Sequence, residues 1–257
     1  MISIKNPIQI QKMRDSGKIL YDALQETILH AKAGVTTMEL DGIAERYIRK
    51  YGAEPAFKGY EGFPGTLCTS LNDSVVHGIP SHKHVCKEGD ILSLDCGAVL
   101  DGMYSDSAIT VGIGKISDAD AKLIATTEKA FFEGAKKAIA GARLGDIGNA
   151  VFQVADKEGY GVIKVLTGHG IGTNLHEEPS IFNFGTPGKG VRIYKNMTVC
   201  IEPMISAGTW DVHMLSDNWT IKTTDGSNCA HYEHTLLIRD GLPELLTYPG
   251  FEWKEDA

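Results

Sequence analysis

Three acidic residues lie inside segments that are otherwise apolar. Asp95 lies in ILSLDCGAV, Glu202 in MTVCIEPMI and Glu233 in HYEHTLLI. A carboxylate buried among apolar residues is costly unless it is paired with a cation or bound to a metal. Taken singly, each could be an exposed strand residue or a salt-bridge partner. Lysine and arginine are scarce in these segments, so for the set as a whole a metal ion is the better counter-charge.

A predicted hairpin brings a fourth carboxylate, Asp106, next to Asp95. The dipeptide Asp101-Gly102 lies between two strand-like runs and is a strong signal for a two-residue turn. With that turn, Asp106 lies opposite Gly97, which shares a face with Asp95 because side chains alternate along a strand. The two carboxylates are then diagonal neighbours, roughly 7 to 8 Å apart between backbones. They would repel each other unless a cation lay between them.

Histidines supply further candidates. His169 and His176 stand in the loop TGHGIGTNLHEEPSI, whose glycines let the backbone turn tightly and approach a ligand closely. We expect the imidazole of His169 to be exposed and unhindered, as suits a metal ligand, and His176 could face the same site. His77, in LNDSVVHGIP, ends a short apolar strand before a turn. The other histidines are interpreted as structural or surface residues, although two of them flank Glu233 and could support it: His30, His82, His84, His213, and the flanking pair His231 and His234.

Two helices are predicted in the first fifty residues. The Asn-Pro pair at 6–7 marks a helix start, and apolar residues then recur at helical spacing until Gly34. Thr36 and Glu39 form a capping box in front of a second helix, which ends at Gly52. Residues 55–90 are rich in glycine and proline, with one short apolar run before His77.

The rest of the chain alternates strands and helices. After the hairpin around Asp101, Ser117 caps a helix running to Gly141, and a shorter helix runs from near Asp146 to Gly159. Strand-like segments follow at 162–166, 197–206, 219–223 and 229–238. The order is helices, strands, helices, strands, in two halves that resemble each other coarsely. This predicts an α+β fold in which helices pack on an antiparallel sheet.

The composition is that of a globular protein with a packed core. Of the 257 residues, 42% are hydrophobic and 23% are charged, which excludes intrinsic disorder. No run approaches the roughly 18 apolar residues that span a bilayer, and the N-terminal segment lacks a signal-peptide core. We therefore expect a cytoplasmic protein with no membrane partner. The formal charge of −8 and the lack of a basic cluster argue against DNA as a partner.

The cysteines and the linker pattern give two further expectations. The five cysteines are odd in number, widely spaced and without a C-x-x-C pair, so they are expected to be reduced thiols. No Pro/Ser-rich linker divides the chain. We therefore expect a single domain over 1–257.

The candidate residues, in their local motifs, resemble a known family. They are His77 in VVHGIP, Asp95 in LDCGA, Asp106 in YSD, His169 in GHGIG, His176 in LHEEP, Glu202 in IEPMI and Glu233 in YEHT. This set is similar to that of the type I methionine aminopeptidases of peptidase family M24, and the resemblance extends from the first helix to about residue 240. It implies a pita-bread fold with two pseudo-symmetric halves. It also implies removal of N-terminal methionine from nascent proteins and peptides, with a preference for a small second residue.

The resemblance implies a centre of two divalent metal ions. Asp95 would bind one ion, His169 and Glu202 the other, and Asp106 and Glu233 would bridge both. The sequence does not determine the metal. One imidazole and four carboxylates suit manganese, iron or cobalt at least as well as zinc.

The same resemblance assigns roles in the reaction. The ions would activate a bridging water and polarise the scissile carbonyl, with Glu202 as the proton shuttle. His176 would hydrogen-bond the carbonyl side of the substrate, and His77 would lie near the scissile nitrogen. Phe57 and Leu175 depart from the pattern of many bacterial members and alter the expected shape of the methionine pocket, but not the reaction. That pocket would be lined by Tyr60, Phe63, Cys68 and Trp219.

The resemblance implies that the partners are N-terminal peptide substrates and nascent chains. It also implies transient association with the ribosome and a monomeric state. Some bacterial members dock on the ribosome through a basic surface loop. In the matching stretch, 207–228, Lys222 is the only lysine or arginine and stands near three aspartates. Docking by that route is therefore not expected.

Two other interpretations remain open. A proline-specific peptidase, prolidase or aminopeptidase P, uses the same five ligands but normally carries a separate N-terminal domain, for which Asp95 comes too early. A non-catalytic pita-bread module that binds peptides or nucleic acid typically lacks metal ligands, and all five are present here.

Overall fold

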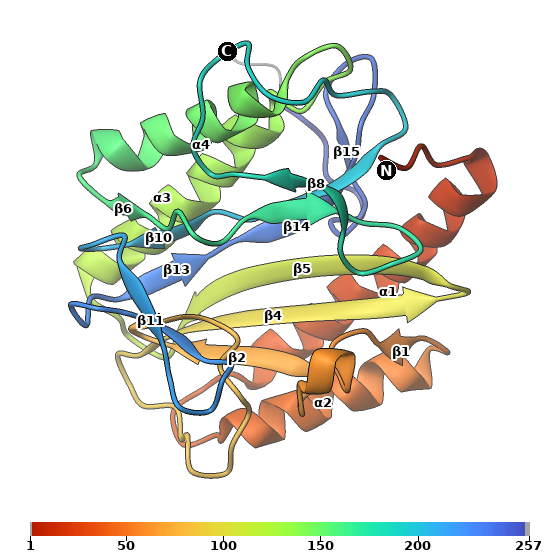
Figure 1. Cartoon of the computed structure of the whole chain (residues 1–257). Coiled ribbons are helices and arrows are strands. Elements are labelled where there is room, and N and C mark those ends of the chain that lie inside the picture. The colour runs from red at the N-terminus through yellow and green to blue at the C-terminus, as the bar shows by residue number, and fades with distance from the viewer. Residues whose placement is uncertain (1, 255–257) are drawn as a thin grey trace.

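The computed structural model describes residues 2–254, in which four helices pack on a large sheet (Figure 1). The helices are α1 (Pro7–His30), α2 (Thr37–Lys50), α3 (Asp118–Ala135) and α4 (Leu144–Lys157), with one 3-10 turn, η1 (Tyr60–Gly62). The main sheet contains β1 (Glu54–Pro55), β2 (Leu67–Leu71), β4 (Ile91–Leu100), β5 (Met103–Gly112), β7 (Gly168–Gly170), β8 (Glu177–Ile181), β9 (Thr198–Ile201), β14 (Glu233–Leu237) and β15 (Glu244–Leu245).

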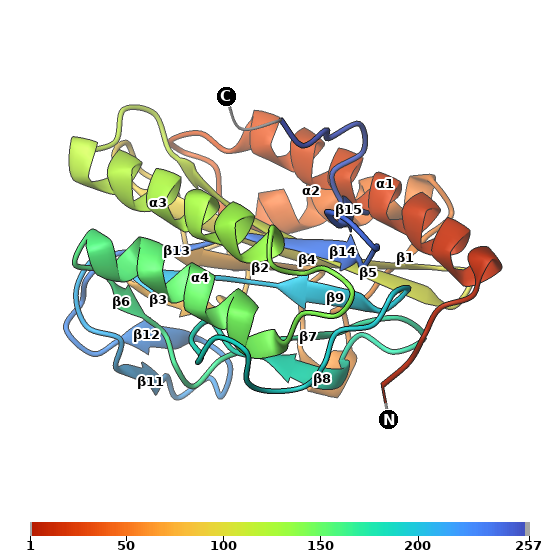
Figure 2. The same ribbon diagram turned by 90° about the horizontal axis from the view of Figure 1, so that it is seen from above.

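Two small sheets accompany the main one. The first joins β13 (Cys229–His231), β10 (Met204–Ser206) and β6 (Gly161–Val162), and the second joins β11 (Val212–Met214), β12 (Ile221–Thr223) and β3 (Ser74–Val76). Figure 2 shows the four helices on one side of the main sheet, with β11 and β12 on the other. The predicted α+β arrangement, helices packed on an antiparallel sheet, is confirmed.

The capping residues begin the helices as predicted. The side-chain oxygen of Asn6 accepts hydrogen bonds from the backbone N–H groups of Ile8 and Gln9, at 3.0 Å each. Thr36 and Glu39 form the predicted capping box. The predicted end of α3 at Gly141 is wrong: the helix ends at Ala135. The N–H of Ala140 donates instead to the carbonyl of Arg239, which draws the chain away from the helix axis.

The apolar faces of the helices form two main cores against the sheet. One lies under α1 and α2 and includes Leu20, Leu40 and Leu94. The other lies under α3 and α4 and includes Phe131 and Ile147. None of the described helices is long and apolar enough to cross a membrane.

The hairpin of β4 and β5 has the predicted register. Asp101 and Gly102 form its two-residue turn, and Gly97 pairs with Asp106. Asp95 and Asp106 are therefore diagonal neighbours on one face, as expected. Gly97 has a packing reason to be glycine, because a Cβ atom there would lie 2.7 Å from the ring of Phe57.

Strand β5 meets β14 at the seam between the two halves of the main sheet, whose order is β1-β4-β5-β14-β9-β7-β8. The ladder across the seam has two backbone pairs, of Glu233 with Ala108 and of His234 with Ser107. Hydroxyl groups extend it. The N–H of Asp106 donates to Oγ1 of Thr235 at 3.0 Å, and that hydroxyl donates to the carbonyl of Asp106 at 2.9 Å.

Two long strands predicted near the C-terminus are each broken by a change of sheet. The segment 197–206 divides into β9 and β10 at Glu202 and Pro203, and 229–238 divides into β13 and β14 at Tyr232. Proline has no N–H for a ladder, which favours a break at that point. Glu202 therefore lies between strands, and not inside one as expected.

Other strand predictions need correction as well. Of 162–166, only Val162 belongs to a strand, and of 219–223 only Ile221–Thr223 does. Strands β1, β2, β7, β8, β11 and β15 were not predicted. Most of these unpredicted strands are short or lie in segments rich in glycine, proline or charge, where alternation of apolar and polar residues is hard to recognise.

Candidate metal centre

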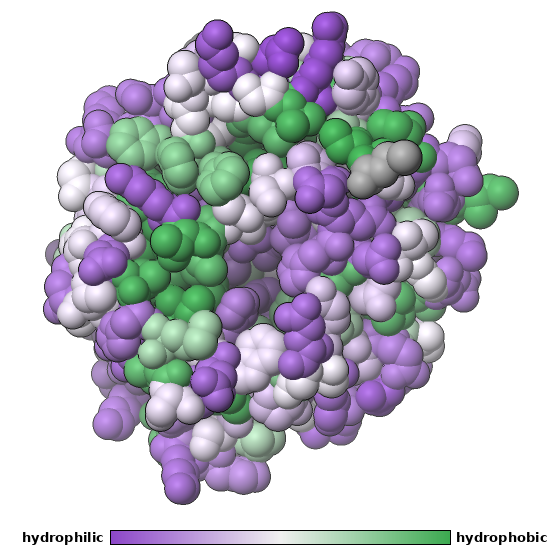
Figure 3. Space-filling view, in the orientation of Figure 1, coloured by the Kyte–Doolittle hydropathy of each residue, from purple (hydrophilic) through white to green (hydrophobic). Residues whose placement is uncertain are grey.

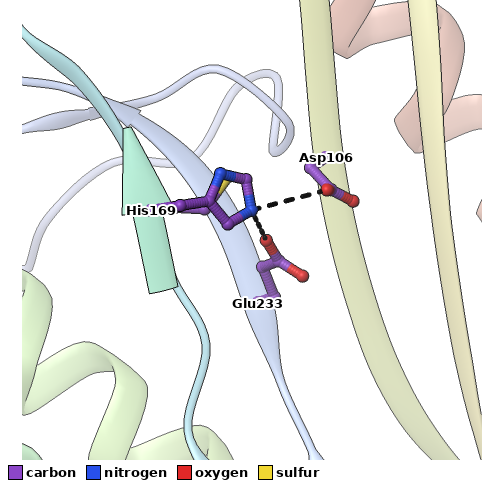
Figure 4. A group of neighbouring side chains, drawn as sticks. Asp106, His169 and Glu233 are labelled. Carbon is purple, nitrogen blue, oxygen red and sulfur yellow. Dashed lines mark ion pairs between the residues drawn. The ribbon is translucent and has the colours of Figure 1, made fainter. Parts of the chain in front are cut away.

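Five predicted metal ligands converge from five parts of the sheet. Asp95 lies on β4, Asp106 on β5, His169 on β7 and Glu233 on β14, and Glu202 follows β9. Figure 4 shows three of these side chains pointing toward one another from separate strands. Nε2 of His169 lies 3.8 Å from Oδ2 of Asp106, 3.7 Å from Oε1 of Glu202 and 4.0 Å from Oε1 of Glu233.

His169 differs in setting from the prediction. It lies in strand β7 and not in a loop. The residue is 8% exposed, so the prediction of an exposed imidazole is wrong. The flanking glycines are needed because neighbouring strands approach closely. A Cβ at Gly168 would lie 2.3 Å from the carbonyl oxygen of Cys200, and one at Gly170 would lie 2.3 Å from that of Glu178.

A backbone carbonyl orients the imidazole of His169. Nδ1 lies 2.9 Å from the carbonyl oxygen of Gly170, which can only accept a hydrogen bond. The proton is therefore on Nδ1, and the lone pair of Nε2 faces the carboxylates. Burial, with a smaller effect of His176, lowers the pKa of His169 to about 3. The ring is neutral at pH 7, as a metal ligand must be.

The carboxylates are buried together without a positive partner. Asp95, Asp106 and Glu233 are each at most 8% exposed. Burial is the main cause that raises the pKa values of Asp106, Glu202 and Glu233, and repulsion between the carboxylates raises them further. No lysine or arginine is among the described residues that line this site.

The donor set fits a divalent metal ion. Among the described residues, six buried side-chain nitrogen or oxygen atoms have no hydrogen-bond partner: one each on Asp95, Asp106 and Glu233, two on the neighbouring His231, and one on Thr66. Carboxylate oxygens and a neutral imidazole nitrogen are ligands for such ions. One oxygen or nitrogen from each of Asp106, His169 and Glu233 lies within 4.8 Å of the others.

The thiol of Cys200 lies in the same group but is not a ligand in the proposed centre. Burial raises the pKa of this thiol well above its ordinary value, and nearby carboxylates raise it further. It also lies 3.5 Å from the hydroxyl of Thr235. All five cysteines are free, as predicted.

A cavity of about 140 Å³ leads to the carboxylates. Figure 3 shows the molecular surface hollowed near the middle of the face opposite the helices. The cavity brings together the predicted pocket residues and both further predicted histidines: Tyr60, Phe63, Cys68, Trp219, His77 and His176. Phe57 and Leu175 line it too.

The histidines of the cavity contact aromatic side chains. The hydroxyl of Tyr60 lies 2.9 Å from Nδ1 of His176. The ring of His176 packs edge-on against His169, with 4.4 Å between centroids. The ring of His77 lies 6.0 Å from that of Trp219. The cavity lining therefore combines aromatic rings with imidazole nitrogens.

Sequence reasoning missed two residues of the site. Glu61 lines the cavity next to Tyr60. His231, interpreted as structural or surface, is buried, with Nε2 at 3.7 Å from carboxylate oxygens of both Glu202 and Glu233. The alternation that paired Asp95 with Gly97 would have placed His231 on the same face as Glu233, two residues away.

Comparisons with known proteins identify the family of this chain. Residues 11–240 match the model of metallopeptidase family M24. The methionine aminopeptidase of Clostridium acetobutylicum is 49% identical over 247 residues, covering 96% of this chain and 99% of that protein. The crystal structure of the methionine aminopeptidase of Thermotoga maritima has a TM-score of 0.95 at 42% identity, covering 96% of this chain and 99% of that one.

A more distant likeness concerns the fold alone. The Xaa-Pro dipeptidase of Bacillus anthracis has a TM-score of 0.77 at 22% identity, covering 97% of this chain and 63% of that chain. This likeness therefore shows a shared architecture and does not bear on the substrate.

Proposed function

The chain belongs to metallopeptidase family M24, and we propose that it is a methionine aminopeptidase, which removes the N-terminal methionine from peptides. The pita-bread fold expected from the sequence motifs is the fold of this family. The observation that carries the proposal is 49% identity to a methionine aminopeptidase across nearly the whole of both chains. The five converging donor residues supply the matching chemistry.

We propose that two divalent ions occupy the centre. Asp95 would hold one, His169 and Glu202 the other, and Asp106 and Glu233 would bridge both. Ions so held lower the pKa of water and polarise a carbonyl, which supplies a nucleophile near neutral pH. The raised pKa values of the buried carboxylates support this assignment, because cations would relieve the repulsion that causes part of the shift.

The protein side chains would divide the remaining work of peptide hydrolysis. Glu202 would take a proton from the attacking water and deliver it to the leaving amine. His176 would donate a hydrogen bond to the substrate carbonyl, and the Tyr60 hydroxyl at 2.9 Å would hold its ring in place. His77, which packs edge-on against Trp219, would contact the scissile nitrogen.

The apolar side of the cavity would accept the methionine side chain. Phe63 packs edge-on against Trp219, with 5.1 Å between centroids, and Cys68 and Leu175 are almost fully buried beside them. An unbranched apolar side chain fits such a wall, with the free α-amine directed at the carboxylates. A free amine is what an internal peptide bond lacks, so the site would act at chain ends.

The test is release of free methionine from Met-Ala-Ser by the purified protein. We expect release that stops with a chelator and returns when manganese, iron, cobalt or zinc is added back. Xaa-Pro peptides are the matched alternative substrates, and Met-Glu-Ser tests the preference for a small second residue. Cleavage of Xaa-Pro peptides without release of methionine would overturn the proposal in favour of a proline-specific peptidase. Failure of every peptide with every metal would favour a binding module.

A further inference from the structure

His231 is buried beside the metal centre with no hydrogen-bond partner for its ring. The residue is 1% exposed, and neither Nδ1 nor Nε2 has a partner. A neutral imidazole carries one donor and one acceptor, and leaving both unpaired in the interior is unfavourable. Such a ring calls for a ligand in the space that it faces.

The backbone of His231 is held by hydrogen bonds on two sides. Its N–H donates to Oγ1 of Thr110 at 2.8 Å, and the same hydroxyl donates to the carbonyl of His231 at 2.8 Å. On the other side, His231 pairs with Met204 in the small sheet. From this fixed backbone the buried ring faces the centre, with Nε2 at 3.7 Å from carboxylate oxygens of Glu202 and Glu233.

Glu202 and Glu233 lie between two imidazoles. Each directs Oε1 at His169, at 3.7 Å and 4.0 Å, and Oε2 at His231, at 3.7 Å in both cases. The side of the carboxylate pair facing His231 therefore presents two oxygens and one nitrogen, all within 4.8 Å of one another. Donors that each bind one ion at about 2.0 to 2.2 Å lie no more than about 4.4 Å apart, and both nitrogen–oxygen distances satisfy this limit.

We propose that Nε2 of His231 is a metal ligand, completing a three-donor cation position with Oε2 of Glu202 and Oε2 of Glu233. The inference rests on the proposed metal centre: it keeps two ions and adds Nε2 of His231 and the second oxygen of Glu202 to the ligands of the ion that lies away from His169. Hydrogen bonding is the other way to satisfy the ring, but 3.7 Å to each oxygen is too long for a hydrogen bond. A second nitrogen makes the centre more suitable for cobalt, iron or zinc relative to manganese.

The first test counts coordinated imidazoles in the wild-type protein loaded with cobalt(II). A ring bound to this paramagnetic ion gives a strongly shifted proton resonance from its other nitrogen. We expect two such resonances, one from His169 and one from His231. A single resonance overturns the inference while leaving the metal centre intact. Absence of bound cobalt overturns the proposed function as well, so the two failures are distinguishable.

The second test uses His231→Gln, with His213→Gln as the matched control because His213 is exposed on β11. We expect His231→Gln to lose one shifted resonance and to weaken cobalt binding, measured by calorimetry, at least 10-fold and more than it weakens manganese binding. The control keeps both resonances. Weaker binding with the resonance count unchanged would mean that His231 only positions Glu202, and would overturn the ligand role. Thermal unfolding of both metal-free variants checks that they fold.

Discussion

At the scale of single residues, the centre is a set of carboxylates that are buried close together, where their negative charges repel one another. Asp106 is 3% exposed, and burial followed by repulsion from Glu233 and Asp95 raises its pKa well above the ordinary value. Its backbone is held by hydrogen bonds with Thr235, which limits how far the residue can move away from the other carboxylates. Such an arrangement favours the binding of a positive charge, and substitution of these residues should change metal binding.

The first prediction concerns Asp106→Asn. The amide keeps the shape but removes one negative charge, so metal content and methionine release should fall together, the latter by more than about 100-fold, beyond what loss of an outer hydrogen bond to a ligand typically causes. Metal analysis and peptide hydrolysis check it. The matched control is Asp156→Asn, an exposed residue on α4. Full activity in Asp106→Asn would refute the bridging role.

A second prediction separates His176 from the ligands. His176→Ala should lower the rate of methionine release about 10²- to 10³-fold, as for removal of one hydrogen-bond donor to a developing negative charge. Bound metal should be unchanged. Because Tyr60 only holds the ring, Tyr60→Phe should cost up to about 1.5 kcal/mol, or about 10-fold in rate. Loss of metal from His176→Ala would contradict this division of roles.

The carboxylates and histidines of the candidate site could be predicted from residue types and local pattern, whereas the pocket residues were predicted only from the family resemblance. Asp95 and Asp106 followed from a turn signal and the alternation of side chains, since both depend on residues close in sequence. Long-range geometry did not follow in the same way. That His169 is buried depends on β8 and β9 lying against β7, and that His231 joins the group depends on Thr110 of β5.

At the scale of elements, a buried ion pair ties the N-terminal segment to the loop between β7 and β8. Lys5 is 2% exposed, and Nζ lies 2.7 Å from Oε2 of Glu177. Oε1 of Glu177 accepts hydrogen bonds from the N–H groups of Thr173 and Asn174. The loop that ends at His176 is therefore held in shape by a residue that precedes α1.

The third prediction concerns this pair. Lys5→Met leaves the carboxylate of Glu177 buried without its partner and should destabilise the protein by about 3 to 5 kcal/mol. Lys5→Met combined with Glu177→Gln should recover part of that loss. Lys18→Met, which removes an exposed pair with Asp22, should change stability by less than about 1 kcal/mol. Denaturant unfolding measures all three, and equal effects of the two lysine substitutions would contradict the prediction.

The elements themselves were predictable in proportion to their length and local signals. The N-termini of α1, α2 and α3 follow from Asn6, the Thr36 capping box and Ser117, because the capping hydrogen bonds are local. The strand break at Pro203 and the end of α3 could not be predicted, since they depend on the sheet or the carbonyl group to which the following residues bind. Strands of two or three residues, such as β11, have too little alternation to recognise.

At the scale of the whole molecule, stability and metal binding should be linked through pH. Burial, opposed by a hydrogen bond from Cys68, raises the pKa of Asp95 to about 7 in the absence of metal. Between the ordinary value of about 4 and this value, the folded form retains a proton that the unfolded chain has lost. The free energy of unfolding of the metal-free protein should therefore fall as pH rises through this window.

The fourth prediction follows from that sign. Bound metal requires ionised carboxylates, so the rise in melting temperature caused by metal should be larger at pH 8 than at pH 5. Thermal unfolding with chelator and with cobalt at both pH values measures it. A metal-induced shift that is equal at the two pH values, or larger at pH 5, would contradict the prediction.

The seam between β5 and β14 has a consequence for local opening. Its backbone ladder has only two pairs, and Asp106 and Glu233 stand on either side of it. An ion held by both carboxylates would act as a cross-link between the first and second halves of the sheet. Separation of these strands would then require release of the ion, so their amide protons should exchange slowly with solvent in the loaded enzyme and faster after chelation. The catalytic centre would in this way also protect the enzyme from proteolysis.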